Sequence, residues 1–381
     1  GCGRLRKLPE SISHLKSLET MNLKGCIKLK KLPEQLGNMK VLTDLLLDET
    51  GVKHLPSSTG ILKKLKKLLV RGEKIVMEKE EELVIEQQPF MPPSLSGLSS
   101  LTTLDISYRD LSNSDISINL GSLSSLQDLN LAGNHFSELP AGTGNLAKLE
   151  KLNLSWCRNL LFISEIPSSL RALVARYCTS LQKVSIQSKT APDLLLGGCG
   201  KLAEIQGLES VENKPVIRMD NCNNLSNNFK GILLQVLSKG KLPDIVLPGS
   251  DVPHWFIQYQ SDRSSSTFRI PSISGGLIPG LIVWTVYAAI GEDRWRRCSL
   301  CSASIRKKKD DDELFYTRPY LDISSEHEGE DADHSWVIYI PFSRIQGAIE
   351  GGDELEVSVK PGDDTIVKKC GVHPIFLSSK L

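Results

Sequence analysis

Cysteine and histidine are the residue types of this chain that could support metal or thiol chemistry. The 381 residues include nine Cys and seven His. Cys298 and Cys301 form the one C-x-x-C pair, and a zinc site needs two ligands beyond such a pair. The remaining candidates lie far from it in the sequence: His327, His334, Cys370 and His373. We therefore expect Cys298 and Cys301 to be two residues of a strand that bind no metal.

Motifs of the common enzyme classes do not occur in the sequence. It contains no G-x-x-x-x-G-K-[ST], no G-x-S-x-G and no H-E-x-x-H. The isolated His254 is expected to be a packing or surface residue rather than a base. We therefore expect this chain to have no catalytic residue, no cofactor and no enzyme activity.

The charge and hydropathy of the chain narrow the classes of partner. Lys and Arg number 46 and Asp and Glu number 45, so the formal net charge is +1. This balance argues against binding of nucleic acid or of an acidic membrane through overall charge. The longest largely apolar run, residues 281–290, is far shorter than the roughly 20 residues of a membrane helix. The expected partners are therefore proteins.

Leucine divides the chain into two parts, with 44 Leu in residues 1–226 and 13 in residues 227–381. In the first part, copies of L-x-x-L-x-L end at a series of apolar residues: Leu23, Leu47, Val70, Ile106, Leu131, Leu154, Ala175, Leu196 and Met219. All intervals but one are 21–25 residues, which is the period of leucine-rich repeats. Leu-Pro pairs at 8–9, 32–33, 55–56 and 139–140 suit the return segments. We expect residues 1–226 to form an α/β leucine-rich-repeat solenoid (a horseshoe) of about nine strands, whose leucines stack inside.

Six cysteines share one position of the repeat, three residues after the last apolar residue of the strand: Cys2, Cys26, Cys157, Cys178, Cys199 and Cys222. Asn134 takes the same position. The row is either a metal or redox site or, as we expect, a ladder of buried free thiols that pack as small apolar groups. Unpaired thiols favour a reducing compartment, the cytoplasm or the nucleus. From the place of Cys2 we also expect the chain to start in mid-repeat.

One interval breaks the period, because Val70 and Ile106 are 36 residues apart. The excess lies at about 73–96, with an acidic stretch at 78–82 followed by prolines. It is interpreted either as a solvated loop or as a partner-binding loop on a rigid scaffold.

The second part has the pattern of a separate β domain, which we place at 240–381. A short helix is expected at 229–238, before several strand-like runs separated by turn residues. Residues 354–359 alternate between polar and apolar, whereas 281–290 is apolar on both faces and predicts a central strand or a buried helix. Several strands without helical periodicity predict an all-β sandwich.

Outward positions of the repeat strands form a surface on which aromatic residues and arginine are the best candidates for partner contacts. From the strand register we select seven: Arg71, Tyr108, Arg109, Trp156, Arg176, Tyr177 and Arg218. The alternative is that they are simply the solvated face of a solenoid.

Ordered motifs of the second part carry a family resemblance. Residues 247–256, L-P-G-S-D-V-P-H-W-F, resemble the L-P-G-S-E-I-P-x-W-F motif of plant TIR-type nucleotide-binding leucine-rich-repeat (TIR-NB-LRR) immune receptors, although Asp251 departs from it. Residues 350–357 and 368–373 resemble later strands of the same domain. The resemblance implies that the second part is the jelly-roll/Ig-like domain of that family.

The resemblance also implies a function for the chain. The repeats and the jelly-roll/Ig-like domain would bind a pathogen effector protein and relieve autoinhibition of the full receptor. The TIR and nucleotide-binding domains of the receptor would be partners, activation would assemble a tetramer, and NAD cleavage would belong to a TIR domain absent from this chain. The alternatives are a non-immune intracellular scaffold or ubiquitin-ligase substrate adaptor, a zinc-dependent enzyme and an extracellular receptor.

Overall fold

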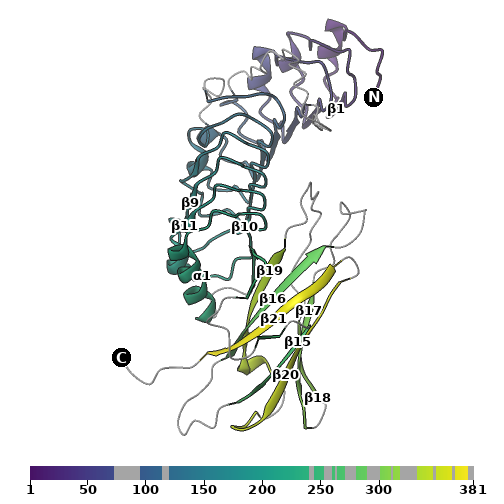
Figure 1. Cartoon of the computed structure of the whole chain (residues 1–381). Helices are drawn as coiled ribbons and strands as arrows, with labels where there is room; N and C mark the ends of the chain where they lie inside the picture. Colours follow the sequence, from purple (N-terminus) through teal and green to yellow (C-terminus); the bar gives the residue numbers. More distant parts are fainter. Residues whose placement is uncertain are drawn as a thin grey trace. The chain divides into compact units, whose positions relative to one another are not determined.

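The structure is a computed structural model of the whole chain, drawn in Figure 1. It describes residues 1–72, 95–113, 120–239, 244–252, 260–261, 264–270, 280–289, 301–309, 312–317, 333–345, 349–362 and 365–375. The chain divides into two compact units, Gly1–Val211 and Glu212–Leu381. Most of the predicted insertion at about 73–96 lies outside the described residues, as do His254, Cys298 and His327.

A parallel sheet with one strand per repeat runs through the first unit (Figure 1). Its strands, in order across the sheet, are β1 (Thr20–Asn22), β2 (Asp44–Leu46), β3 (Lys67–Leu69), β4 (Thr103–Asp105), β5 (Asp128–Asn130), β6 (Lys151–Asn153), β8 (Ala172–Val174) and β10 (Asp193–Leu195). Neighbours pair in register, so Leu45, Leu68 and Leu104 lie side by side. These central residues are buried, while the residues on either side of them are more exposed. The predicted solenoid is therefore confirmed, and the central residues of its strands face inward as expected.

The return side of the coils contains short 3-10 helices and a smaller parallel sheet. The helices are η1 (Glu10–His14), η2 (Leu36–Asn38), η3 (Ser57–Ile61), η4 (Leu120–Ser122), η5 (Thr143–Asn145) and η6 (Leu208–Ser210), and the strands are β7 (Phe162–Ile163), β9 (Lys183–Ser185) and β11 (Glu204–Gln206). Pro9 and Pro56 stand immediately before η1 and η3 with φ of −69° and −57°. The fixed φ of proline suits this entry into a helical turn.

The cysteine position of the repeat forms a ladder of buried thiols. The Sγ atoms of Cys157, Cys178 and Cys199 donate to the carbonyl oxygens of Leu131, Leu154 and Ala175, at 3.4, 3.1 and 3.0 Å. Each acceptor is the last apolar strand residue of the preceding repeat. Cys26 and Cys222 are buried as well, but Cys2 is exposed, so the predicted ladder holds for five of its six members.

Asn134, like the thiols at the same position of other repeats, donates hydrogen bonds to backbone carbonyl oxygens. Its Nδ2 donates to the carbonyl oxygens of Leu131 and Ile106 at 2.8 and 3.0 Å, and its Oδ1 accepts from the backbone N–H groups of Arg109 and Leu111, both at 3.1 Å. The amide therefore satisfies four backbone groups of two neighbouring coils. A buried polar side chain is stable here because it is fully hydrogen-bonded.

The second unit begins with β12 (Ile217–Arg218) and α1 (Asn227–Ser238). The helix expected at 229–238 starts earlier because Ser226 caps it, with its Oγ accepting from the backbone N–H of Phe229 at 3.1 Å. Strands then dominate, as the sequence predicts.

Two sheets make up the rest of this unit. One has the order β12, β13 (Asp244–Pro248), β19 (His334–Pro341), β16 (Gly280–Ala289), β21 (Thr365–Ile375) and β14 (Gln260–Ser261). The other has the order β15 (Ser265–Arg269), β20 (Glu354–Lys360), β17 (Ser302–Lys307) and β18 (Asp312–Thr317), and η8 (Phe342–Arg344) follows β19. Because β16 pairs with both β19 and β21, it is the predicted central strand and not a buried helix.

One buried cluster joins residues of both sheets. Trp336 of β19 and Val283 of β16 pack in the same cluster as Phe268 of β15, Ile305 of β17 and Leu355 of β20. Along β20 buried and more exposed residues alternate, as expected from its sequence. The apolar alternation of the strands thus builds the core of this unit.

Candidate protein-recognition site

The turn after seven of the eight strands of the larger sheet in the first unit repeats an unusual backbone. Two residues beyond the last apolar strand residue, φ is positive: 72° at Gly25, 56° at Glu49, 53° at Tyr108, 67° at Gly133, 66° at Trp156, 57° at Tyr177 and 76° at Gly198. This left-handed conformation favours glycine and is uncommon for bulky residues. The repeat geometry nevertheless imposes it on four non-glycine residues. We call these seven residues the turn row, because they occupy one equivalent position of the repeat.

Aromatic side chains pack along the turn row. The rings of Trp156 and Tyr177 stack with their centroids 4.3 Å apart and an interplanar angle of 19°. The Tyr108 ring lies against Gly133, where an added Cβ would be 2.2 Å from Tyr108 Cδ1, and the Tyr177 ring lies against Gly198, where the same distance would be 2.5 Å. The two glycines therefore leave the space that the tyrosine rings fill. All three aromatic residues remain partly exposed, which is the setting of a typical contact anchor.

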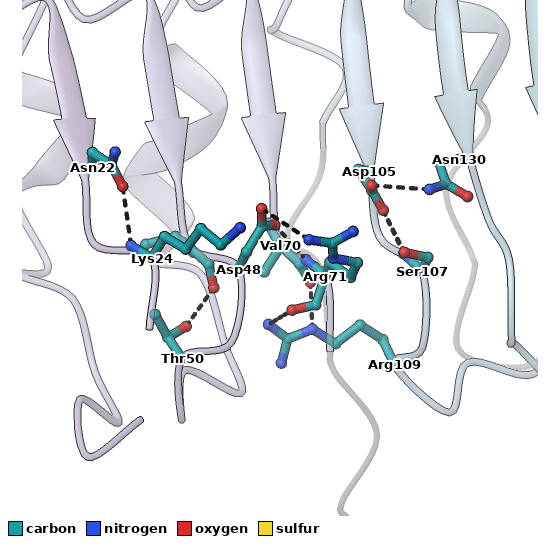
Figure 2. Close-up of polar contacts among 11 residues, drawn as sticks. Asn22, Lys24, Asp48, Thr50, Val70, Arg71, Asp105, Ser107, Arg109 and Asn130 are labelled. Atoms are coloured by element: carbon teal, nitrogen blue, oxygen red, sulfur yellow. Dashed lines mark hydrogen bonds and ion pairs between the residues drawn. The ribbon is translucent and has the colours of Figure 1, made fainter. Parts of the chain in front are cut away.

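Polar side chains at the ends of neighbouring strands are tied together (Figure 2). Asp48 Oδ1 accepts from the backbone N–H of Arg71 at 3.2 Å, and Asp48 Oδ2 lies 3.8 Å from Arg71 Nη2. Asp105 Oδ1 accepts from Ser107 Oγ at 2.6 Å, while Asp105 Oδ2 accepts from Asn130 Nδ2 at 2.9 Å. These bonds fix the side chains at the strand ends, and such preorganisation would lower the entropy cost of binding a partner.

Arg109 is directed at the backbone of the preceding coils. Its Nε donates to the carbonyl oxygen of Val70, and its Nη2 donates to that of Arg71 at 3.5 Å (Figure 2). Its Nη1 donates to the carbonyl oxygen of Val52 at 3.2 Å. Burial lowers the pKa of the Arg109 guanidinium to about 10, although nearby Asp48 counteracts this. The group is thus still a cation at neutral pH. Arg109 is predicted from the sequence as a contact residue. In this structure its side chain bonds the turn after β4 to the preceding coils.

The predicted contact residues of the first unit fall into two groups. Tyr108 and Arg109 follow β4 and lie beside Arg71, whose side chain is 40% exposed. Trp156 and Tyr177 stack on each other, and the backbone N–H of Trp156 donates to the carbonyl oxygen of Arg176 at 2.7 Å. The second group combines an aromatic pair with an arginine and is the stronger candidate for a contact patch.

Arg218 does not belong to an exposed face. It is 2% exposed, and its Nη1 donates to Asp244 Oδ1 at 2.9 Å and to the carbonyl oxygen of Ile217 at 3.0 Å. Trp336 Nε1 donates to the second carboxylate oxygen of Asp244 at 3.2 Å. The prediction that Arg218 lies on an outward surface is wrong, because both residues of β12 are buried and the alternation of a one-sided strand does not apply.

Arg158 and the glycines of the turn row are functional candidates that the sequence reasoning missed. The Arg158 guanidinium carbon lies 5.5 Å from the centroid of the Trp156 ring, within the range of a cation–π contact. Gly25, Gly133 and Gly198 occupy one position of the repeat, and that recurrence was the available signal for a left-handed turn. It would have placed Tyr108, Trp156 and Tyr177 in one row.

In the described part of the chain the possible metal ligands do not cluster, and the thiols of Cys301 and Cys370 are buried. Within it, no group of three or more His, Cys, Asp or Glu side chains is placed to hold a metal ion. Burial raises the pKa of Cys301 to about 11 and that of Cys370 to about 12, so both thiols are protonated at neutral pH and are poor nucleophiles and ligands. Among the same residues, no helix has both the length and the apolar character needed to cross a bilayer.

Comparison with curated proteins finds relatives that are plant disease resistance proteins. The chain is 37% identical over 166 residues to TMV resistance protein N of Nicotiana glutinosa, covering 44% of this chain and 14% of that protein. It is 28% identical over 272 residues to disease resistance-like protein DSC1 of Arabidopsis thaliana (69% and 21% covered) and 27% identical over 381 residues to disease resistance protein RPS4 of the same plant (88% and 30% covered). The chain thus spans less than a third of the length of these relatives. No family model matches it.

Solved structures similar to this chain contain leucine-rich repeats. The protein LIC12759 of Leptospira interrogans shares 19% identity with a TM-score of 0.31, over 62% of this chain and 74% of that chain. The leucine-rich repeat domain of the type III effector XCV3220 (XopL) shares 24% identity with a TM-score of 0.36, over 58% and 67%.

Proposed function

We propose that this chain is the effector-sensing region of a plant TIR-type nucleotide-binding leucine-rich-repeat receptor. In this proposal the repeats bind a pathogen effector protein, and binding relieves autoinhibition of the full receptor. The repeat solenoid, the post-repeat motifs and the similarity to plant disease resistance proteins support it. The role is recognition and not catalysis.

The proposal also covers the second part of this chain and the rest of the receptor. Residues 240–381 would be the jelly-roll/Ig-like domain. The TIR and nucleotide-binding domains of the same receptor would be partners of this chain. Effector binding would let the full receptor assemble as a tetramer in the cytoplasm or the nucleus.

The observation that carries the proposal is the patch formed by Trp156, Tyr177 and Arg176. The two aromatic rings are stacked outside the core, on turns whose left-handed backbone makes such residues uncommon. Arg176 immediately precedes Tyr177, and its carbonyl oxygen accepts a hydrogen bond from the backbone N–H of Trp156. A stacked aromatic pair with the Arg158 guanidinium carbon 5.5 Å from the Trp156 ring has the composition of a protein-binding hot spot.

A two-hybrid screen followed by calorimetry tests the proposal. The full chain serves as bait against a library of secreted pathogen proteins, and each binder is purified and titrated against variant chains. Trp156→Ala combined with Arg176→Ala should weaken binding by about 30-fold or more, as expected for hot-spot residues. Thermal melts should show that the variant stays folded.

Phe162→Ala supplies the matched control, because Phe162 is an aromatic residue of β7 that is 46% exposed and lies in the smaller sheet. It should leave binding unchanged. Full binding by the Trp156 and Arg176 variant would contradict the assignment of the patch. A library without any binder would contradict direct effector recognition by this chain.

A further inference from the structure

Exposed basic side chains recur on the return segments of the first three repeats. The residues immediately before the Leu-Pro pairs at 8–9, 32–33 and 55–56 are basic, and we call five of them the basic ladder: Arg6, Lys7, Lys30, Lys31 and Lys53. All five are exposed. In the described part of the chain none of them makes an ion pair or a side-chain hydrogen bond. Their charges are therefore available to a partner.

The coils that carry the ladder lie against one another. A Cβ added at Gly51 would be 2.8 Å from the carbonyl oxygen of Ile27, and Ser58 Oγ donates to the carbonyl oxygen of Glu34 at 2.6 Å. The segment that contains Lys53 thus runs beside the segment that contains Lys30. Adjacent segments therefore carry like charges, and an anionic partner would relieve their repulsion.

The excess of positive charge is confined to this end of the first unit. Residues 1–72 contain 15 Lys and Arg against six Asp and Glu, whereas residues 95–211 contain nine against ten. The near-neutral total of the chain hides this asymmetry. A surface with such an excess of positive charge steers association with an oppositely charged partner.

We propose that the basic ladder docks an acidic protein segment that also carries an apolar side chain. Ile27 is 54% exposed within the same segment as Lys30, so an apolar contact is available beside the charges. Residues 1–72 contain no Phe, Trp or Tyr on which a base could stack, and the ladder has one Arg against four Lys. Sites for single-stranded nucleic acid use aromatic stacking platforms, so their absence here favours a carboxylate-bearing polypeptide. This surface is separate from the Trp156 patch.

Fluorescence anisotropy with a labelled peptide of glutamates and leucines tests the docking. The full chain should bind the peptide at low salt, and added salt should weaken binding by screening. Replacing Lys30, Lys31 and Lys53 with Gln should weaken binding by about tenfold or more, given three exposed ion pairs.

The matched control replaces three other exposed lysines, Lys16, Lys40 and Lys63, each placed two residues after a 3-10 helix. This variant loses the same charge and should bind within about twofold of the unmodified chain. Equal weakening by both triple variants would overturn the proposal, because overall charge alone would then be responsible. Tighter binding of an oligothymidylate of matched charge would overturn it in favour of nucleic acid.

Discussion

The indole ring of Trp156 stacks on the phenol ring of Tyr177 at a centroid distance of 4.3 Å, and both residues have a left-handed backbone. Such a backbone costs of order 1–3 kcal/mol for a residue other than glycine. Ring stacking returns about 0.5–1.5 kcal/mol, and the packing of adjacent coils supplies the remainder. The pair is therefore preorganised on a rigid scaffold, which is what a contact anchor requires.

The stacked pair should show a measurable coupling energy. In a double-mutant cycle of Trp156→Ala and Tyr177→Ala, the free energies of unfolding in urea should differ from additivity by about 0.5–1.5 kcal/mol. Trp156→Gly should be more stable than Trp156→Ala by about 1 kcal/mol, because glycine tolerates the φ of 66°. Additive single effects would show that the rings are merely adjacent.

Glycine at the turn row should resist substitution. Gly133→Ala and Gly198→Ala should each lower the free energy of unfolding by about 1–3 kcal/mol, because φ is positive and the new Cβ would overlap a tyrosine ring. Gly200→Ala is the control, since a Cβ there meets nothing within 4 Å. Urea titrations of the three variants, followed by circular dichroism, make the comparison. Equal stability of Gly133→Ala and Gly200→Ala would refute the steric role of Tyr108.

The periodic features of this fold could be predicted from the sequence because they come from burial. The spacing of residues such as Leu45, Leu68 and Leu104 fixed the strands, since a solenoid stacks equivalent residues. The same logic located the inward thiols of Cys157, Cys178 and Cys199. It also identified Trp156 and Tyr177 as residues that flank the outward surface.

Contacts between segments of irregular geometry could not be read in this way. Arg109 looked like an exposed cation, yet its guanidinium reaches carbonyl groups of two earlier coils, which no local pattern encodes. Arg218 looked outward because strand alternation was assumed, but Asp244 and Trp336 are supplied by strands distant in sequence. Stacking of Trp156 on Tyr177 depended on a left-handed backbone that propensity alone argues against.

The thiol ladder should be chemically inert in the folded protein. Burial raises the pKa of the Cys157 thiol to about 12, and a hydrogen bond with Cys199 together with burial raises that of Cys178. Of the eight cysteines that the structure describes, Cys2 alone is exposed. Brief alkylation with iodoacetamide at pH 8, followed by peptide mass spectrometry, should therefore modify Cys2 and spare Cys157 and Cys178 until urea is added. Early labelling of Cys157 would contradict the buried ladder.

The same thiols should make the fold sensitive to alkali. A thiol whose pKa is raised on folding holds its proton more tightly in the folded state than in the unfolded chain. The stability it contributes is therefore complete below its ordinary pKa of 9.0 and is lost as pH rises towards about 12. Urea unfolding between pH 8 and pH 11 should show a smaller decline for Cys157→Ala than for the unmodified chain. An identical decline would show that Cys157 does not contribute.

Removing one partner of the buried ion pair of Arg218 and Asp244 should lower the free energy of unfolding more than replacing both partners with apolar residues. Asp244→Ala leaves the guanidinium uncompensated and removes the acceptor of Trp336 Nε1, so the free energy of unfolding should fall by about 3–5 kcal/mol. Arg218→Met combined with Asp244→Leu removes both charges and retains apolar volume. Its loss should be smaller than that of Asp244→Ala, because no unpaired charge remains buried.

Urea denaturation followed by circular dichroism measures the three free energies, and the slope of each transition shows whether it stays cooperative. Lys368→Gln is the control, because its ion pair with Asp333 lies at the surface, with the lysine side chain 43% exposed, and should contribute less than about 1 kcal/mol. If the paired replacement costs as much as Asp244→Ala, the pair does more than neutralise its own burial. The ion pair would then set the register in which β12 pairs with β13, and apolar side chains of similar volume could not replace it.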